Sequence, residues 1–295
     1  FKKLFCYICK SECNSYFNLK NVPMGAQYFT QNKTKSKTLK SNFIVYECPD
    51  CNLVQTKVDK VSYYKHTIRS SSFSTRMMDF RTDQFNKILN QIHIKNPSVF
   101  ELGCGQGEYL DIFKNLGCKT FGIEGSKENF TKNIEKEHVV ENNFLNKKYS
   151  NNFFKDKVDL LVSFNFIEHL PDPMSSLKIA KTLLKQNGVG ILEVPNFNVI
   201  KDKFLFNEFI PDHLFYYTKD TFHLLLELSG FEIIDMKTIE DNYIISACVK
   251  VKNKISWELF ENQRKNLKKQ IQIFFENSPK ESNFIWSAGH QSLTS

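Results

Sequence analysis

Four cysteines near the start of the chain form two short pairs. Two residues separate Cys6 from Cys9, two separate Cys48 from Cys51, and 38 residues lie between the pairs. Each pair can present two thiolates to one metal ion, and four thiolates complete the tetrahedral shell that Zn²⁺ favours. Because such a shell leaves no open position, we predict a structural zinc site that stabilises a segment with a thin apolar core.

A glycine-rich loop follows a short apolar segment further along the chain. Residues 97–102 predict a strand, and the segment 101–107, Glu-Leu-Gly-Cys-Gly-Gln-Gly, leads from it into a helical pattern. Gly103, Gly105 and Gly107 let the backbone turn sharply and come close to a ligand. The order predicts a ligand-binding loop between the first strand and the first helix of an α/β domain.

An acidic residue follows this loop at the end of the next predicted strand. Glu124 ends the next predicted strand, 21 residues after Gly103. A carboxylate at this point can accept hydrogen bonds from the two hydroxyls of a ribose. The order strand, loop, helix, strand and acid therefore favours a nucleoside-type cofactor. A glycine turn in another α/β domain and a nicotinamide enzyme stay open as alternatives, although the loop spacing fits the dinucleotide pattern less well.

The elements that must position these residues alternate between strand and helix. Apolar runs predict strands at 119–125, 158–164 and 188–196, and the segments around them include helical patterns. This alternation predicts a doubly wound parallel sheet of the α/β class. Two further predicted strands, 231–239 and 243–251, are close enough in sequence to pair antiparallel.

Composition divides the chain into four parts. Residues 1–60 form the predicted zinc-binding module. Residues 61–95 are a predicted linker that ends in a helix over about 74–92 and contributes to the substrate pocket. Residues 96–252 carry the alternating pattern of a cofactor-binding catalytic domain. Residues 253–295 predict one helix and one strand, which we interpret as an incomplete C-terminal α/β domain.

Overall composition excludes several classes of protein. Of the 295 residues, 41% are hydrophobic and 14% aromatic, which is enough to fill a core and argues against a disordered chain. The net charge is 40 − 32 = +8, and residues 1–60, with ten Lys and four Asp or Glu, contribute +6 of it.

No apolar run approaches the roughly 18–20 residues of a membrane span, and the start does not fit a signal peptide. We expect a cytoplasmic protein, where reduced cysteines favour metal binding over disulfides.

The segment 101–107 resembles motif I of the class I S-adenosylmethionine-dependent methyltransferases. The resemblance implies a Rossmann-like sheet and spans about residues 97–250. It implies that Glu101, Gly103, Gly105 and Gly107 bind the amino-acid half of S-adenosylmethionine. It also implies that Glu124 binds the cofactor's ribose.

Two further segments extend this resemblance. Asn142, Asn143 and Phe144 stand where the family binds adenine. Residues 165–173, Asn-Phe-Ile-Glu-His-Leu-Pro-Asp-Pro, resemble the end of the family's fourth strand, so Asn165 is a further expected cofactor contact. S-adenosylmethionine and a structural Zn²⁺ are thus the expected cofactors.

A zinc module in front of a class I domain resembles the zinc-containing sugar C-methyltransferases, which act on nucleotide-linked 4-keto deoxysugars. Residues 63–71 resemble the Tyr/Arg/Ser stretch of that family, and residues 211–217 resemble its Glu-His-x-x-Tyr segment, with Asp212 in place of the Glu. Residues 284–290 resemble the strand and turn that begin its C-terminal nucleotide-binding domain. The expected partner is therefore a nucleotide-linked sugar.

The implied reaction assigns roles to the remaining residues. C-methylation beside a ketone needs a base that removes a carbon-bound proton and donors that hold the enolate. His213 is the expected base, because the pKa of histidine, about 6.5, suits neutral pH, and Asp212 assists it or binds substrate. His169 is expected to orient the substrate or donate to its oxygen. Tyr64 or His66 is expected to cover the same pocket.

Three other functions stay open at this point. A sugar O-methyltransferase can use the same histidine as its base. A zinc-containing RNA methyltransferase suits the basic N-terminal part, but the lysines there have few aromatic residues among them, so nucleic acid is not the expected partner. A non-catalytic scaffold conflicts with the intact glycine loop and Glu124. We expect no membrane partner, and a monomer or weak oligomer.

Overall fold

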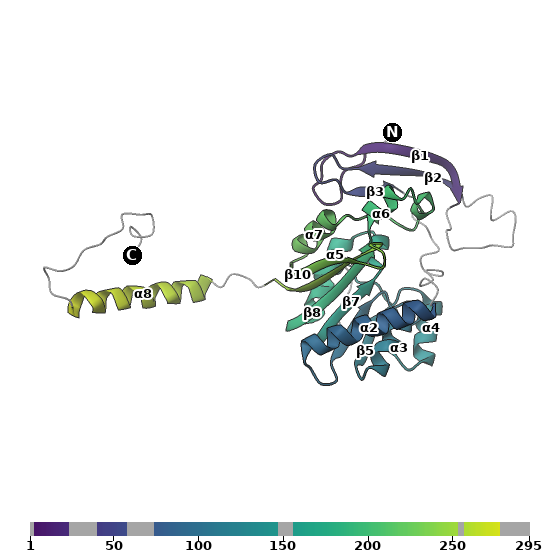
Figure 1. Ribbon diagram of the computed structural model, residues 1–295. Helices are drawn as coiled ribbons and strands as arrows, with labels where there is room; N and C mark the ends of the chain where they lie inside the picture. Colours follow the sequence, from purple (N-terminus) through teal and green to yellow (C-terminus); the bar gives the residue numbers. More distant parts are fainter. Residues whose placement is uncertain (1–2, 24–39, 58–73, 147–155, 253–256, 278–295) are drawn as a thin grey trace. The chain divides into compact units, whose positions relative to one another are not determined.

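The computed structural model describes residues 3–23, 40–57, 74–146, 156–252 and 257–277 (Figure 1). The described residues up to Lys252 form one compact unit, and the helix α8 belongs to a second. The first unit contains a seven-stranded sheet and a smaller four-stranded sheet. This is the α/β Rossmann-like fold with an N-terminal cysteine cluster that the sequence predicts.

The large sheet has the order β10-β11-β8-β7-β4-β5-β6. Its five neighbouring strands from β8 to β6 run parallel, whereas β11 pairs antiparallel with both β8 and β10. The antiparallel pairing of the last two strands is confirmed. The strands of this sheet are β4 (Ser98–Leu102), β5 (Lys119–Ile123), β6 (Val139–Glu141), β7 (Val158–Phe164), β8 (Leu184–Pro195), β10 (Phe231–Ile239) and β11 (Ile244–Val251).

Successive side chains of a strand point to opposite faces of the sheet, and the central strands have apolar side chains on both faces. Helices therefore cover both faces of this sheet. On one face, Val99 of β4 and Leu160 of β7 pack with residues of α2 and α3. On the other face, Phe100 and Leu161 pack with α5 and α7. The helices are α2 (Thr75–Ile92), α3 (Glu108–Asn115), α4 (Lys127–Glu135), α5 (Pro173–Leu183), α6 (Phe197–Asp202) and α7 (Lys219–Leu228), with short 3-10 helices η2 (Ile167–His169) and η3 (Phe206–Glu208).

Two helix boundaries show how local sequence and the sheet compete. Helix α2 begins where Ser74 accepts a hydrogen bond from the Met77 amide at 3.2 Å, as an N-cap residue does, and it matches the predicted range. The sequence of residues 173–188 predicts a helix that Asn187-Gly188 ends, but α5 ends at Leu183 and residues 184–187 already belong to β8. Pairing of Val158 with Leu184 explains the early start of the strand.

The small sheet joins the N-terminal part to the large domain. Its order is β1-β2-β3-β9, from strands β1 (Asn14–Pro23), β2 (Lys40–Glu47), β3 (Val54–Lys57) and β9 (Phe215–Tyr216). Val54 pairs with Tyr216, so a strand from the C-terminal half of the chain completes the N-terminal sheet. In Figure 1 this sheet lies beside α6 and α7 at one end of the unit.

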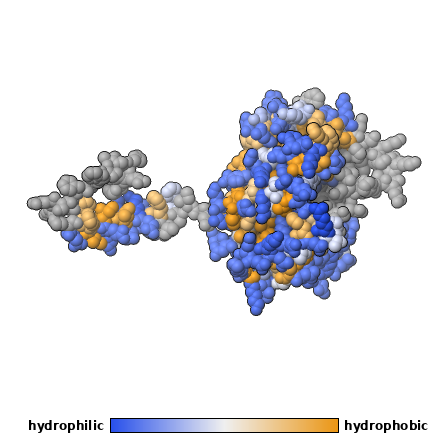
Figure 2. All heavy atoms as spheres, viewed as in Figure 1, coloured by the Kyte–Doolittle hydropathy of each residue, from blue (hydrophilic) through white to orange (hydrophobic). Residues whose placement is uncertain are grey.

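Helix α8 (Trp257–Asn277) matches the predicted C-terminal helix. Hydrophobic side chains lie exposed along it, among them Trp257, Phe260 and Phe274. Figure 2 shows hydrophobic atoms along this helix. The strand predicted beyond it, within residues 284–290, lies outside the described residues.

Candidate active site and metal centre

A cavity of about 480 Å³ lies beside the carboxyl ends of β4, β5 and β7. In α/β sheets, ligands bind at these strand ends, where the strand order reverses. Glycine-loop residues form one end of the cavity, and His169 and His213 contribute to its lining. The predicted cofactor residues Glu101, Gly103 and Gly105 all line it.

Glu124 ties the glycine loop to the end of β5. Its carboxylate accepts hydrogen bonds from the backbone amides of Gly105 at 2.9 Å and Ser126 at 2.7 Å. Burial raises the pKa of Glu124 to about 7, although these two amide donors act in the opposite direction. A buried carboxylate held in this way presents acceptor oxygens to the cavity, as ribose hydroxyls require.

Two glycines allow aromatic rings to pack closely against this end of the cavity. Gly103 has a φ of +73°, and a Cβ there would lie 2.4 Å from the ring of Phe166. A Cβ on Gly125 would lie 1.9 Å from the ring of Phe144. Phe144 lines the cavity, where its ring can pack against a flat base.

Glu101 contributes a buried acceptor that lacks a partner. Among the described residues, its Oε2 atom has no hydrogen-bond partner. Burial raises the pKa of Glu101 well above its ordinary value, and the Arg81 guanidinium opposes this shift. A cationic amino group in the cavity would satisfy this oxygen. Glu101 and Glu124 therefore fit the amino end and the ribose of S-adenosylmethionine.

The other predicted cofactor residues take different positions. Asn165 lines the cavity, and its Oδ1 atom has no partner among the described residues. Asn143 is exposed, and its side-chain amide donates to Glu141 at 3.0 Å. Gly107 precedes α3 with a φ of +79°, and a Cβ there would lie 2.3 Å from Asn133 Oδ1. A glycine at this position therefore lets Asn133 of α4 pack against the loop.

The two histidines lie together at the cavity wall. The rings of His169 and His213 have centroids 4.8 Å apart. Nδ1 of His169 donates to the backbone carbonyl of Asp212 at 2.7 Å. Burial lowers the pKa of His169 to about 4 and holds the pKa of His213 well below its ordinary value. Both rings are therefore uncharged at neutral pH, and the nitrogen without an N–H group in each can accept a proton or a hydrogen bond.

Asp212 and Glu168 complete the surroundings of these rings. The structure gives Asp212 a positioning contact through its backbone carbonyl, and its side chain is buried. Glu168 lies 3.8 Å from His169, measured from Oε1 to Nε2, and is 1% exposed. Burial raises the pKa of Glu168 to about 8, so its carboxyl group is protonated at neutral pH. Tyr64 and His66 lie outside the described residues.

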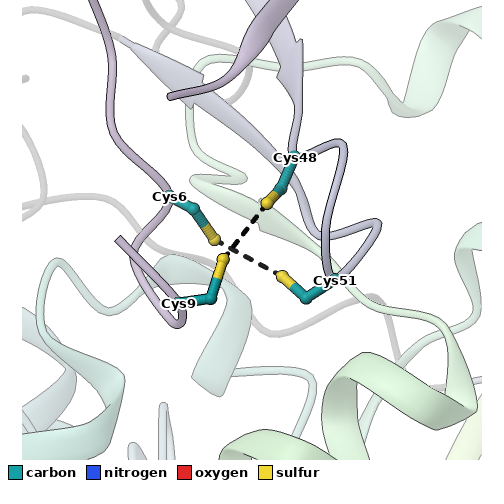
Figure 3. Close-up of side chains that lie close together, drawn as sticks. All are labelled: Cys6, Cys9, Cys48 and Cys51. Atoms are coloured by element: carbon teal, nitrogen blue, oxygen red, sulfur yellow. Dashed lines mark hydrogen bonds between the residues drawn. The ribbon is translucent and has the colours of Figure 1, made fainter. Parts of the chain in front are cut away.

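The four cysteines converge on one point (Figure 3). The Sγ atoms of Cys6 and Cys51 are 3.5 Å apart, and those of Cys9 and Cys48 are 3.2 Å apart. In a tetrahedral shell with Zn–S bonds of about 2.3 Å, neighbouring sulfurs are about 3.8 Å apart. The donor set and its convergence therefore fit a four-coordinate zinc ion.

Hydrogen bonds connect the cysteine module to the loop that carries His213. The backbone amide of Thr56 donates to the Leu214 carbonyl at 2.9 Å, and its hydroxyl donates to the His213 carbonyl at 3.0 Å. Tyr7 donates its hydroxyl to the Asp172 carboxylate. The backbone position of His213 thus depends on the small sheet.

Two buried residues near the cavity carry no signal in the sequence. Arg81 of α2 makes an ion pair with Glu193 of β8 at 2.5 Å, and both side chains are 0% exposed. The guanidinium lies over the rings of Tyr109 and Phe164, which line the cavity. A charged residue on a helix and an acid within a strand are ordinarily interpreted as solvent-facing. Glu168, next to His169, lies within the segment 165–173 that the sequence singles out. Its residue type alone, however, does not show that it is buried.

Comparison with known proteins decides the family. A family model described as a methyltransferase domain matches residues 73–236, more than half of the chain. The chain belongs to this family. The match covers the glycine loop, Glu124 and both histidines, and confirms the expected class I S-adenosylmethionine-dependent methyltransferase domain.

Curated relatives of this methyltransferase cover only part of it. A ubiquinone biosynthesis O-methyltransferase of Haemophilus ducreyi is 30% identical over 125 residues, which is 38% of this chain and 52% of the relative. A tRNA U34 carboxymethyltransferase of Nautilia profundicola is 25% identical over 201 residues, 62% of this chain and 66% of that protein. The chain spans about half the length of the O-methyltransferase relative.

A solved structure supports the fold of the methyltransferase domain. The crystal structure of an S-adenosylmethionine-dependent methyltransferase from Clostridium acetobutylicum has a TM-score of 0.50 and 12% identity, and the match covers 60% of this chain and 92% of that one. At this identity the likeness concerns the fold alone. Within the described residues, no helix is long and apolar enough to cross a membrane.

Proposed function

We propose that this methyltransferase transfers the methyl group of S-adenosylmethionine to a carbon of a nucleotide-linked keto sugar. The supporting observation is that one cavity is lined both by Glu124 and the glycine loop and by the uncharged histidines His169 and His213. The similarity of residues 63–71 and 211–217 to sugar C-methyltransferases supports the sugar as acceptor. The bound cofactor would supply an electrophilic methyl group on its sulfonium.

The residues of the chain would prepare the acceptor. His213 takes the carbon-bound proton, and the electron pair of the broken C–H bond becomes the enolate that attacks the methyl group. Burial lowers the pKa of His213, so its ring is uncharged at neutral pH and has a free nitrogen for that proton, although it is a weaker base than a histidine of ordinary pKa. Alignment of carbon and methyl group then supplies much of the acceleration.

Incubation with methyl-labelled S-adenosylmethionine tests this proposal. The protein is offered two pools, total RNA and nucleotide-linked sugars that include 4-keto forms. Label in a sugar supports the proposal, and NMR of the product then separates C-methyl from O-methyl. Label in RNA alone contradicts it.

O-methylation of the same sugar is the second candidate. A relative named as an O-methyltransferase favours it. The His213 ring can remove a hydroxyl proton as well as a carbon-bound one, so the proposed base is the same. NMR of the labelled product decides between the two.

We also propose that Cys6, Cys9, Cys48 and Cys51 bind a structural zinc ion. The convergence of the four sulfurs supports this assignment. The ion would have no open position, so it would stabilise the small sheet and take no part in the chemistry.

A further inference from the structure

Glu168 is a buried acid whose oxygens have no partner. Both carboxyl oxygens lack a hydrogen-bond partner within the described parts of the chain, and the residue is 1% exposed. A buried polar group without a partner costs free energy, so its retention calls for an explanation. Glu168 contributes to the lining of the cavity that holds the two histidines, which connects this acid with the chemistry.

His169 has a complementary deficiency. Its Nδ1–H group already donates to the Asp212 carbonyl at 2.7 Å. The uncharged ring therefore has no second N–H group with which to donate. The ring can donate to an acceptor oxygen only if Nε2 gains a proton. Glu168 Oε1 lies 3.8 Å from this nitrogen.

We propose that Glu168 donates its carboxyl proton to Nε2 of His169 as negative charge develops on the oxygen of the methyl acceptor. The O–H bond of Glu168 breaks, its electron pair remains on the carboxylate, and a new N–H bond forms on His169. The His169 cation then donates a hydrogen bond to the enolate oxygen, while His213 holds the proton removed from the carbon. The inference rests on the proposed function, and Glu168 acts through His169 as a positioning residue.

At rest the proton stays on Glu168, and the transfer becomes favourable only when negative charge beside His169 raises the pKa of its ring. Burial raises the pKa of Glu168 to about 8 and lowers that of His169 to about 4, so at neutral pH the acid holds the proton. Within the described residues, the titratable groups that interact with Glu168 include His169, His213, Tyr217 and Tyr243, and Tyr243 donates its hydroxyl to Glu208 at 2.7 Å. Burial keeps both tyrosines protonated, and both histidines are uncharged, so a developing oxyanion would add negative charge next to two neutral rings.

A spectroscopic experiment tests the transfer without the sugar substrate. The complex with S-adenosylhomocysteine is titrated with 4-nitrophenol, whose phenolate imitates the enolate, and nitrogen NMR of the histidine rings follows protonation of His169. We expect protonation of Nε2 in the wild type and none in Glu168→Gln, which keeps the size but cannot donate a proton. Equal protonation in both proteins overturns the proposal.

Kinetics supply the second readout. With the acceptor found by labelling, Glu168→Gln should lower kcat by about 10²–10⁴-fold and leave the KM for S-adenosylmethionine unchanged, as loss of acid catalysis does. The wild-type rate should fall as the pH rises through about 8. Glu168→Gln should lack this fall, and Glu168→Asp should restore part of the rate. Glu227→Gln, an exposed acid on α7, is the matched control.

The outcomes separate this inference from the proposed function. If Glu168→Gln methylates the sugar at the wild-type rate, the inference fails and the function stands. If no sugar is methylated but the binding of phenolate still leads to proton transfer from Glu168 to His169, the function fails and the transfer stands. Ligand atoms of Glu168, His169 and His213 lie within 4.8 Å of one another, a spacing that can also hold a cation. Loss of phenolate binding on treatment with EDTA would assign them to a metal and overturn the transfer.

Discussion

The cysteine cluster and the histidine cluster satisfy their polar atoms in opposite ways. In the first, each sulfur lies close to another sulfur, and together they define one point. In the second, Glu168 lacks partners among the described residues, and the ring nitrogens not used for backbone contacts are available in a cavity. A closed set of donors stabilises a fold, whereas an open set is available for a ligand or a proton. Removal of residues from the two clusters should therefore have different effects.

The largest expected effect is on folding. Cys48→Ser should remove the proposed zinc and unfold the small sheet, because structural zinc contributes about 10–16 kcal/mol in isolated zinc-binding peptides. Metal content by mass spectrometry and thermal unfolding measure this. Cys248→Ser is the control, since Cys248 lies in β11 of the large sheet and outside the four-sulfur group. An equal zinc content in Cys48→Ser and wild type would remove the metal assignment.

The next effect is on turnover alone. His213→Ala should lower the rate of methyl transfer by about 10²–10⁴-fold, because the proposed base is lost. Affinity for S-adenosylhomocysteine and the melting temperature should stay near the wild-type values. His223→Ala, on the exposed side of α7, provides the control. A wild-type rate in His213→Ala would show that another group removes the proton.

A smaller effect concerns the cofactor. Glu124→Ala should weaken the binding of S-adenosylmethionine by about 10- to 100-fold, as expected for lost hydrogen bonds to a charged group. Isothermal titration calorimetry measures the change. If Glu124→Ala bound S-adenosylmethionine as tightly as the wild type, Glu124 would not be the residue that binds the ribose.

The smallest effect is a pH dependence of the same contact. Since burial raises the pKa of Glu124 to about 7, its ionised form decreases as the pH falls through this value. Binding of S-adenosylhomocysteine that requires the carboxylate should be about 10-fold weaker at pH 6 than at pH 8. Calorimetry at both pH values gives the ratio. A Glu124→Gln variant that keeps the full dependence would assign it to another group.

Local patterns in the sequence predict the elements of the large sheet well. The spacing of Met77, Phe80, Phe85, Ile88 and Leu89 predicts α2, and the apolar run at 158–164 matches β7. The glycine loop and the acid after it are also visible locally, because both depend on short stretches of backbone. The convergence of the two Cys pairs joins residues 45 and 39 positions apart, and it is predicted by the preference of zinc for four thiolates and not by a local pattern.

Contacts between distant residues explain what the sequence does not reveal. The pairing of Val54 with Tyr216 joins positions 162 residues apart, and no local pattern indicates it. The buried pair of Arg81 and Glu193 depends on α2 packing against β8. The proton held by Glu168 depends on burial, which is a property of the folded chain and not of the residue type.

Strand β9 has a consequence for the history of this protein. Because the last strand of the small sheet comes from residues 215–216, the N-terminal segment alone does not supply all four strands of that sheet. A recombination event that exchanged residues 3–57 for those of a relative would also have to preserve the edge offered by Phe215 and Tyr216. The two segments should therefore be inherited together.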